Sequence, residues 1–171
     1  MNALKGYQIP IVGLADGRYT YKFNVDAAFF DHFENEEMQQ HRFEVQIDLD
    51  KQLNMFILNF EINGTLDTEC DRCLANISLP IQQSYRLIMK MEEGESEDPD
   101  VEHIAPDAMH IDVDHSIYEY VLMSLPMVNV YDCENDDPRP CDLDALDALE
   151  QSKDSGDSSV WDALKNIDVE K

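Results

Sequence analysis

The chain has 171 residues, enough for one domain with a sizeable core, and carries 37 acidic against 12 basic residues for a net charge of −25. Residues 1–91 contribute −5 of this charge and residues 92–171 contribute −20. A surface this negative repels phosphate backbones, which argues against strong direct nucleic-acid binding. It favours either a basic protein partner or solubility alone.

The sequence shows no export leader and no apolar run near the ~18 residues that a membrane span needs. We therefore expect a cytoplasmic protein that does not contact membranes. In the reducing cytosol structural disulfides are disfavoured.

The first ninety residues carry strand patterns. Residues 19–25, 42–50 and 53–62 alternate apolar and polar side chains, as half-buried strands do, with a turn expected at Lys51 and Gln52. Asn63–Gly64 is a tight-turn signal. The strand-like run at 77–91 contains Pro80, which favours an edge position or a bulge.

Short helices are expected at two places. Asp26 is a candidate N-cap for residues 27–33, whose phenylalanines cover one face of the sheet. A second helix over residues 115–125 is opened by residues 112–114 and ended by Pro126. Its apolar positions recur at helical spacing and should pack on the sheet; they are Ile117, Tyr120, Val121 and Leu125.

These elements predict an α+β fold: one domain over residues 1–141, built on an antiparallel sheet able to curl toward a barrel. Residues 92–100 form an acidic loop with nothing to bury, expected to be mobile, and a short strand follows at 101–105. Residues 142–171 are expected to form an acidic, partly disordered tail with a short helix near Trp161. That helix, with Leu164 and Ile167 one turn apart, either docks on the body or binds a partner's groove.

Four cysteines lie in two pairs, Cys70 with Cys73 and Cys133 with Cys141. One hypothesis is a structural zinc ion held by four thiolates, since Cys-x-x-Cys turns present two sulfurs to a tetrahedral metal. The second pair, with seven residues between its cysteines, makes a weaker knuckle. A redox dithiol and unlinked reduced thiols are the alternatives, and the redox hypothesis is disfavoured because a strand-like run follows the motif where a helix N-terminus is usual.

No catalytic or cofactor-binding residue is predicted. The histidines are scattered without metalloprotease spacing, and the six glycines form no phosphate-binding loop; the histidines are His32, His41, His103, His110 and His115. The protein is therefore predicted not to be an enzyme.

In order along the chain, residues 9–33, 64–81, 112–134 and 161–167 resemble the YceD family of large ribosomal RNA subunit accumulation proteins. Cys70, Arg72 and Cys73 match its cysteine motif; Cys133 matches a position where cysteines often occur, and Cys141 matches less well. The resemblance implies a bacterial or organellar factor needed for accumulation of large-subunit ribosomal RNA, with no enzymatic activity established. Family members are commonly encoded beside a small basic ribosomal protein of the large subunit.

The function predicted from both lines is non-enzymatic support of large-subunit assembly, by holding a basic ribosomal protein before RNA takes it. The expected partner is a basic ribosomal protein or a ribosome-assembly factor. An alternative is direct binding or processing of ribosomal RNA, which a basic stripe on one sheet face would support; the candidates are Lys22, Arg42, Lys51, Arg72, Arg86 and Lys90. A further alternative is a zinc- or thiol-dependent redox-responsive protein.

Overall fold

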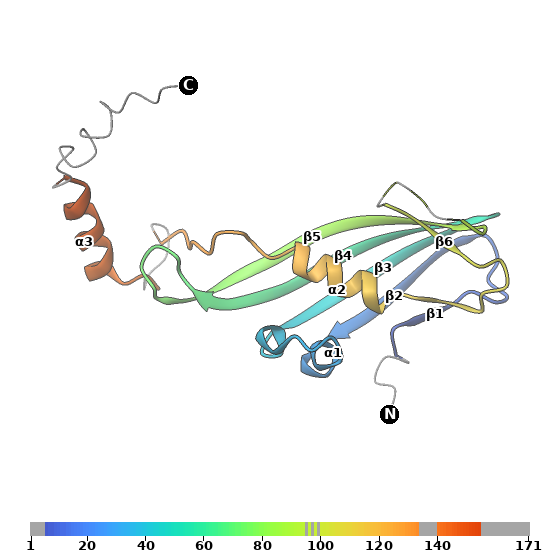
Figure 1. Ribbon diagram of the computed structural model, residues 1–171, viewed down its shortest axis with the longest axis horizontal. Helices are drawn as coiled ribbons and strands as arrows, with labels where there is room; N and C mark the ends of the chain where they lie inside the picture. Colours follow the sequence, from blue (N-terminus) through green and yellow to red (C-terminus); the bar gives the residue numbers. More distant parts are fainter. Residues whose placement is uncertain (1–5, 95, 97, 99, 134–139, 155–171) are drawn as a thin grey trace, which may run out of the picture. The chain divides into compact units, whose positions relative to one another are not determined.

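A computed structural model describes residues 6–94, 96, 98, 100–133 and 140–154 (Figure 1). Its contacts divide the chain into two compact units. The first comprises Met1–Asp67 and Ser78–Met127, and the second comprises Thr68–Ile77 and Val128–Lys171. These units follow contacts in space, whereas the boundary expected at residue 141 follows composition along the chain and stays a prediction.

The main element is a five-stranded sheet in the order β2-β3-β4-β5-β6. Its strands are β2 (Gly17–Val25), β3 (Arg42–Gln52), β4 (Met55–Glu69), β5 (Asn76–Met91) and β6 (Val101–Ile104). Strand β2 pairs antiparallel with β3, and β3 pairs antiparallel with β4. With helices α1 (Ala27–His32), α2 (Asp114–Met123) and α3 (Leu143–Asp154), the described residues confirm an α+β fold.

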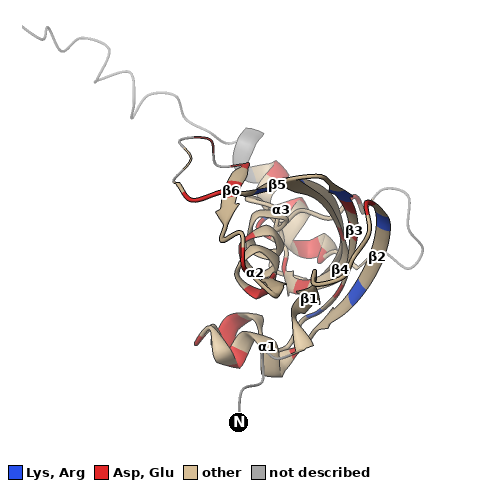
Figure 2. Cartoon of the chain, turned by 90° about the vertical axis from the view of Figure 1, so that its right-hand side faces the viewer, with Lys and Arg blue, Asp and Glu red and all other residues tan. Residues whose placement is uncertain are grey.

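The predicted sheet is confirmed in part, with two differences. Within the described residues the sheet is open, with β2 and β6 as its edges, and does not close into a barrel. It curves around α2 and β1, which fill its concave side, so burial of that face does not need closure (Figure 2). The sheet is also mixed, because the loop at 92–100 carries the chain back so that β6 runs parallel to β5, with Ile88 opposite Val101.

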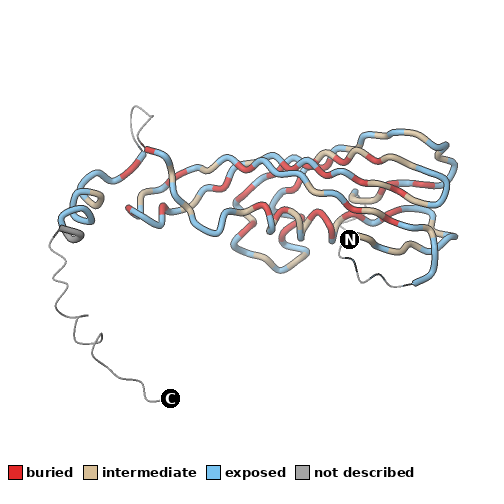
Figure 3. The backbone as a smooth tube through the Cα atoms, turned by 90° about the horizontal axis from the view of Figure 1, so that it is seen from above, coloured by how far each residue is buried: buried red, intermediate tan, exposed pale blue. Residues whose placement is uncertain are grey.

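The strands form where expected because apolar side chains meet on one face. In the register of the first three strands, Phe23 lies opposite Val45 and Val45 lies opposite Ile62. Buried residues alternate with more exposed ones along β3 and along most of β4, as the period-two geometry requires (Figure 3). Pro80 lies before the Ile88–Met91 stretch of β5 that pairs with β6, so β6 does not need a hydrogen bond from it.

The predicted turn at Asn63–Gly64 is wrong, and β4 runs straight through these residues. Gly64 lies opposite Phe43 in the β3–β4 register. A Cβ built on Gly64 would collide with the Phe43 ring and lie 2.8 Å from the carbonyl oxygen of Arg42. The chain instead turns between Gln52 and Met55, which pair directly, so the turn expected at 51–52 falls two residues later.

Helix α1 begins as predicted at Asp26, whose Oδ1 accepts hydrogen bonds from the N–H groups of Ala28 (3.0 Å) and Phe29 (3.3 Å). Two short strands were not foreseen from the sequence. These are β1 (Gln8–Pro10) and β7 (His110–Asp112), which form a separate antiparallel pair. The pair buries Ile9 and Ile111 in the core.

Helix α2 packs on the sheet as its apolar spacing predicts. Ile117 and Val121 are fully buried. The Tyr120 ring stacks on Tyr85 at 4.7 Å and meets Phe60 edge-on at 4.9 Å. These contacts fasten α2 to β4 and β5.

The second unit contains helix α3, which lies where no element was predicted. Asp142 caps it, because its Oδ1 accepts the N–H of Ala145 at 3.1 Å. The predicted helix near Trp161 lies outside the described residues. In the described part of the chain, none of the helices has the length and apolar character needed to cross a membrane.

Candidate functional site

The four cysteines all belong to the second unit, and all four are buried. Among the described residues of this unit the only other buried side chain is Ile77. The aromatic and aliphatic core of the protein lies in the first unit. The interior of the second unit is therefore made largely of cysteine sulfur.

The first pair lies on the turn that joins β4 to β5. The N–H of Cys70 donates to the carbonyl of Ala75, and the N–H of Leu74 donates to the carbonyl of Cys70, both at 2.8 Å. Leu74 has a φ of 59° and is 73% exposed. A left-handed backbone is costly for leucine, so the surrounding turn holds it in place.

A second chain segment is fixed to this turn by two residues. The N–H of Asp71 donates to the carbonyl of Asn129 at 2.8 Å, and the N–H of Asn129 donates to Oδ2 of Asp71 at 2.6 Å. The Asn129 side-chain amide also donates to Oγ1 of Thr68 at 3.5 Å. These bonds hold the start of the segment that carries Cys133 and Cys141.

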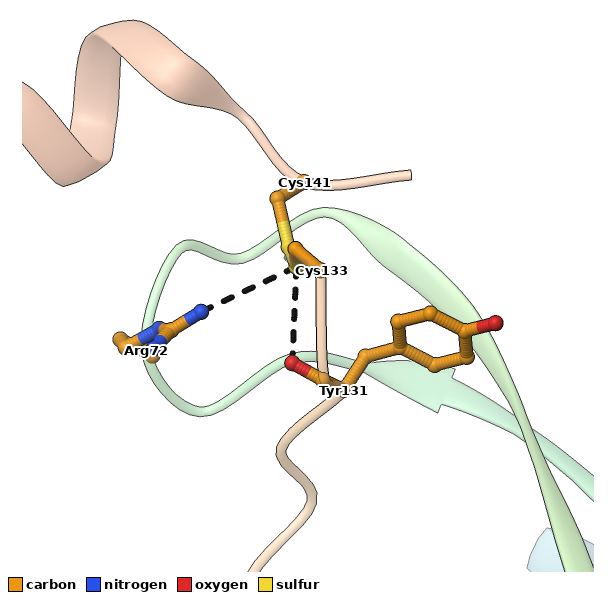
Figure 4. The surroundings of a disulfide bond; sticks show 4 residues. All are labelled: Arg72, Tyr131, Cys133 and Cys141. Atoms are coloured by element: carbon orange, nitrogen blue, oxygen red, sulfur yellow. Dashed lines mark hydrogen bonds between the residues drawn. A yellow bond between two sulfur atoms is a disulfide. The ribbon is translucent and has the colours of Figure 1, made fainter. Parts of the chain in front are cut away.

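The second pair is joined by a disulfide bond, with the two Cα atoms 6.2 Å apart (Figure 4). The Arg72 guanidinium donates to the Cys133 sulfur at 3.7 Å, and that sulfur lies 3.4 Å from the Tyr131 carbonyl oxygen. Arg72 sits between Cys70 and Cys73 in the sequence. It therefore links the first cysteine turn to the second pair.

The Cys70 thiol is set apart by its surroundings. Burial raises the pKa of Cys70, but the N–H groups of Arg72, Cys73 and Tyr131 and the Cys73 thiol all hydrogen-bond to it. Together these donors lower the pKa of Cys70 below its ordinary value. The site thus favours a thiolate at this position.

The structure places the four predicted cysteines in one unit, but they do not form a set of four free thiols around one point. Cys70 and Cys73 are free thiols, Cys133 and Cys141 are bonded, and no group of three or more metal-ligating side chains stands ready among the described residues. Sequence reasoning missed Asp71, Asn129 and Tyr131, which align the two segments. No local pattern marks these three residues, because their role depends on contacts about 60 positions apart in the chain.

The comparisons place the chain in a family. The family model described as "Large ribosomal RNA subunit accumulation protein YceD" matches residues 58–168, about two thirds of the chain, including all four cysteines. The resemblance at residues 9–33 lies outside that match. No match was found among curated proteins or among solved structures. Over its larger part, and through the whole cysteine region, the chain belongs to the YceD family of large ribosomal RNA subunit accumulation proteins.

Proposed function

We propose that this protein is a non-enzymatic factor that supports assembly of the large ribosomal subunit by binding a basic ribosomal protein until RNA takes it. The family description names accumulation of large-subunit ribosomal RNA and no reaction. The observation that carries the choice of partner is the charge, −25 overall with −20 in residues 92–171. Opposite charge speeds encounter with a cationic protein and repels RNA.

Part of this charge is concentrated on β6 and α2 of the first unit. Asp100 just before β6, Glu102 on β6 and Glu119 on α2 are here called the acidic cluster, because all three act on Tyr120. Burial, and then the charge of Glu119, raises the pKa of Glu102, which His115 partly offsets. Burial together with all three carboxylates raises the pKa of Tyr120 to about 12.

Burial and the charge of Glu119 disfavour the ionised form of Glu102 until a positive charge approaches. A lysine- or arginine-rich partner would relieve this repulsion on binding. The acidic cluster is therefore the surface of the first unit that we assign to the basic partner.

The test is affinity isolation of the full chain from native lysate at low salt, with and without ribonuclease, followed by mass spectrometry. A basic large-subunit protein should be captured in both conditions. Binding of that protein is then compared between two variants that lose the same charge. One neutralises the acidic cluster (Asp100→Asn, Glu102→Gln, Glu119→Gln), and the control neutralises three exposed residues elsewhere in the first unit (Glu34→Gln, Glu36→Gln, Glu37→Gln).

The cluster variant should bind several-fold more weakly than the control, because placement of the charge matters more than its total. Equally weakened binding in the two variants would contradict the assigned surface, because it would mean that only the total charge of the protein matters. If the basic protein is no longer captured after ribonuclease treatment, RNA bridges the two proteins and direct binding between them is excluded.

Direct RNA binding is the second candidate, favoured by the open face of the sheet. Five basic residues of β2, β3 and β5 share this face; they are Arg18, Lys22, Arg42, Arg86 and Lys90. Five carboxylates share it as well; they are Glu44, Asp48, Asp50, Glu61 and Asp67. Of the six predicted basic candidates, Lys51 lies on the opposite face and is paired with Asp16, and Arg72 lies in the second unit.

A face with balanced charge binds RNA weakly, since affinity rests on uncompensated phosphate contacts. Gel shifts against large-subunit RNA fragments should therefore show no sub-micromolar binding at ~150 mM salt. Sub-micromolar binding that is lost in Lys22→Ala and Arg86→Ala would favour this second candidate over the first.

A further inference from the structure

We infer that the second unit holds a structural zinc ion on the thiolates of Cys70, Cys73, Cys133 and Cys141. The inference does not rest on the proposed function, since it concerns only how this unit is held together. It assigns the disulfide between Cys133 and Cys141 to the oxidised, metal-free form of the same site.

The first argument is what the unit lacks. Its described residues bury only four cysteines and Ile77, and its large apolar side chains are otherwise mostly exposed; the exposed ones are Leu74, Val128, Val130, Leu143 and Leu149. A unit this small with so few apolar contacts needs a covalent or metal crosslink to stay folded. Zinc on four thiolates supplies folding free energy directly.

The second argument is the shape of the first turn. The carbonyl of Cys70 accepts the N–H of Leu74, and the N–H groups of Arg72 and Cys73 point at the Cys70 sulfur. This arrangement sets both sulfurs on one side of the turn and donates backbone hydrogen bonds to a thiolate, as a zinc knuckle requires.

The third argument is the convergence of the two pairs on Tyr131. Its N–H hydrogen-bonds to the Cys70 sulfur, while its carbonyl oxygen lies 3.4 Å from the Cys133 sulfur. Arg72 reaches the same Cys133 sulfur from the first turn. The sulfurs of Cys70 and Cys133 therefore both lie beside Tyr131. Cys73 is held near Cys70 by the first turn, and Cys141 is held near Cys133 by the disulfide.

The fourth argument is charge. Zn²⁺ on four thiolates has a net charge of −2, which is costly in a buried site unless donors offset it. The Arg72 guanidinium and the backbone N–H groups around Cys70 are such donors. Arg72 serves no comparable purpose beside a neutral disulfide, and the backbone N–H groups serve none beside a neutral Cys70 thiol.

The two forms interconvert by a balanced step. A dithiol reductant gives two electrons and two protons to the Cys133–Cys141 bond and becomes a disulfide itself. The two thiols produced join Cys70 and Cys73, and zinc binding then displaces four protons. Oxidation of the loaded site runs in reverse and releases the metal.

The first experiment measures zinc and thiols on the full chain purified with dithiothreitol. Metal analysis should give about one zinc per chain. Rapid alkylation followed by intact mass should add no label to the loaded protein and four labels after a zinc chelator is added. Less than about a tenth of a zinc per chain would overturn the inference, as would two labels with or without chelator, because that pattern is a lasting disulfide beside two free thiols.

The second experiment replaces zinc with Co²⁺, whose visible bands report tetrahedral thiolate coordination. The full chain should show these bands, and Cys141→Ser should shift and weaken them. Arg72→Ala should lower zinc affinity about 10- to 100-fold, since second-layer partners of metal ligands have effects of this size. Leu74→Gly is the matched control in the same turn and should keep full affinity; loss of affinity in Leu74→Gly with none in Arg72→Ala would contradict the assigned roles.

Discussion

Gly64 on β4 lies directly opposite Phe43 on β3, and the Phe43 ring fills the space that a Cβ at position 64 would take. Gly64→Ala should therefore destabilise the first unit by about 1–3 kcal/mol, because the buried ring and the Arg42 carbonyl cannot both move aside. This cost exceeds the small entropic gain that alanine usually brings in place of glycine. Urea unfolding measures it.

Gly6→Ala is the control, since nothing lies within 4 Å of a Cβ built there. It should change stability by less than about 0.5 kcal/mol. Equal effects of the two substitutions would show that the Phe43 ring does not fix the residue at position 64.

The contact between Asp71 and Asn129 gives a prediction for the second unit. Asp71→Ala removes the acceptor of the Asn129 N–H, a bond of 2.6 Å, and should make opening of the cysteine turn easier by about 1 kcal/mol. Native-state alkylation of Cys70 and Cys73 in metal-free protein should speed up about fivefold. Asp71→Asn keeps an oxygen acceptor and should fall between the wild type and Asp71→Ala. Identical rates in all three proteins would show that this contact does not hold the turn closed.

The sequence predicted strands well where one face had to be buried. Alternation in residues 19–25 and 42–50 fixed which side chains face the core, because a shift of one residue would turn every apolar side chain to solvent. Pairing of the two middle strands was misjudged at Asn63–Gly64. Position 64 needs a glycine because the Phe43 ring, 21 positions earlier in the sequence, fills the space of a side chain there. Local turn preferences cannot predict a contact between residues this far apart.

The second unit was harder to predict. Asp142 and the leucines that follow it carry a helix signal, but the acidic composition suggested disorder instead. The four cysteines were identified from their types and pairing. The Asp71–Asn129 contact holds the two cysteine segments in one unit. This contact joins residues 58 positions apart, and no pattern in a single sequence predicts it.

The acidic cluster predicts how stability depends on pH. Because the pKa of Glu102 is raised in the folded state, mainly by burial and by Glu119, folding favours its protonated form. Its ionised form therefore costs stability at neutral pH, and this cost fades as pH falls through the folded pKa toward 4.5, the value for an unperturbed group. Glu102→Gln should raise the melting temperature by about 1–2 °C at pH 7.

That gain should shrink as the pH approaches 4.5, and it should be larger in a His115→Gln background, since His115 partly offsets the effect of Glu119. Glu93→Gln, a matched loss of charge in the exposed loop, should leave the melting temperature unchanged. A gain from Glu102→Gln that is constant from pH 7 to pH 5 would show that titration of this carboxyl is not its source.

The last prediction concerns Trp161, which lies outside the described residues but inside the family match. Trp161, Leu164 and Ile167 are spaced about one helical turn apart in an acidic segment, as in helices that bind a groove. If the segment binds the partner, Trp161→Ala should raise the dissociation rate about 30-fold, since a buried aromatic anchor contributes ~2 kcal/mol. Raising salt from ~50 to ~300 mM should instead slow association several-fold, because screening acts on the encounter.

The competing hypothesis, in which the segment docks on its own protein, predicts a different result for the same substitution. Trp161→Ala would then lower the melting temperature and leave the dissociation rate of the partner unchanged, because the lost contacts are internal. Asn166→Ala is the control, since its position is on the opposite side of the expected helix from the apolar stripe. Measuring both quantities on both variants decides between the hypotheses, and a Trp161→Ala protein that matches Asn166→Ala in both would remove this tryptophan from either role.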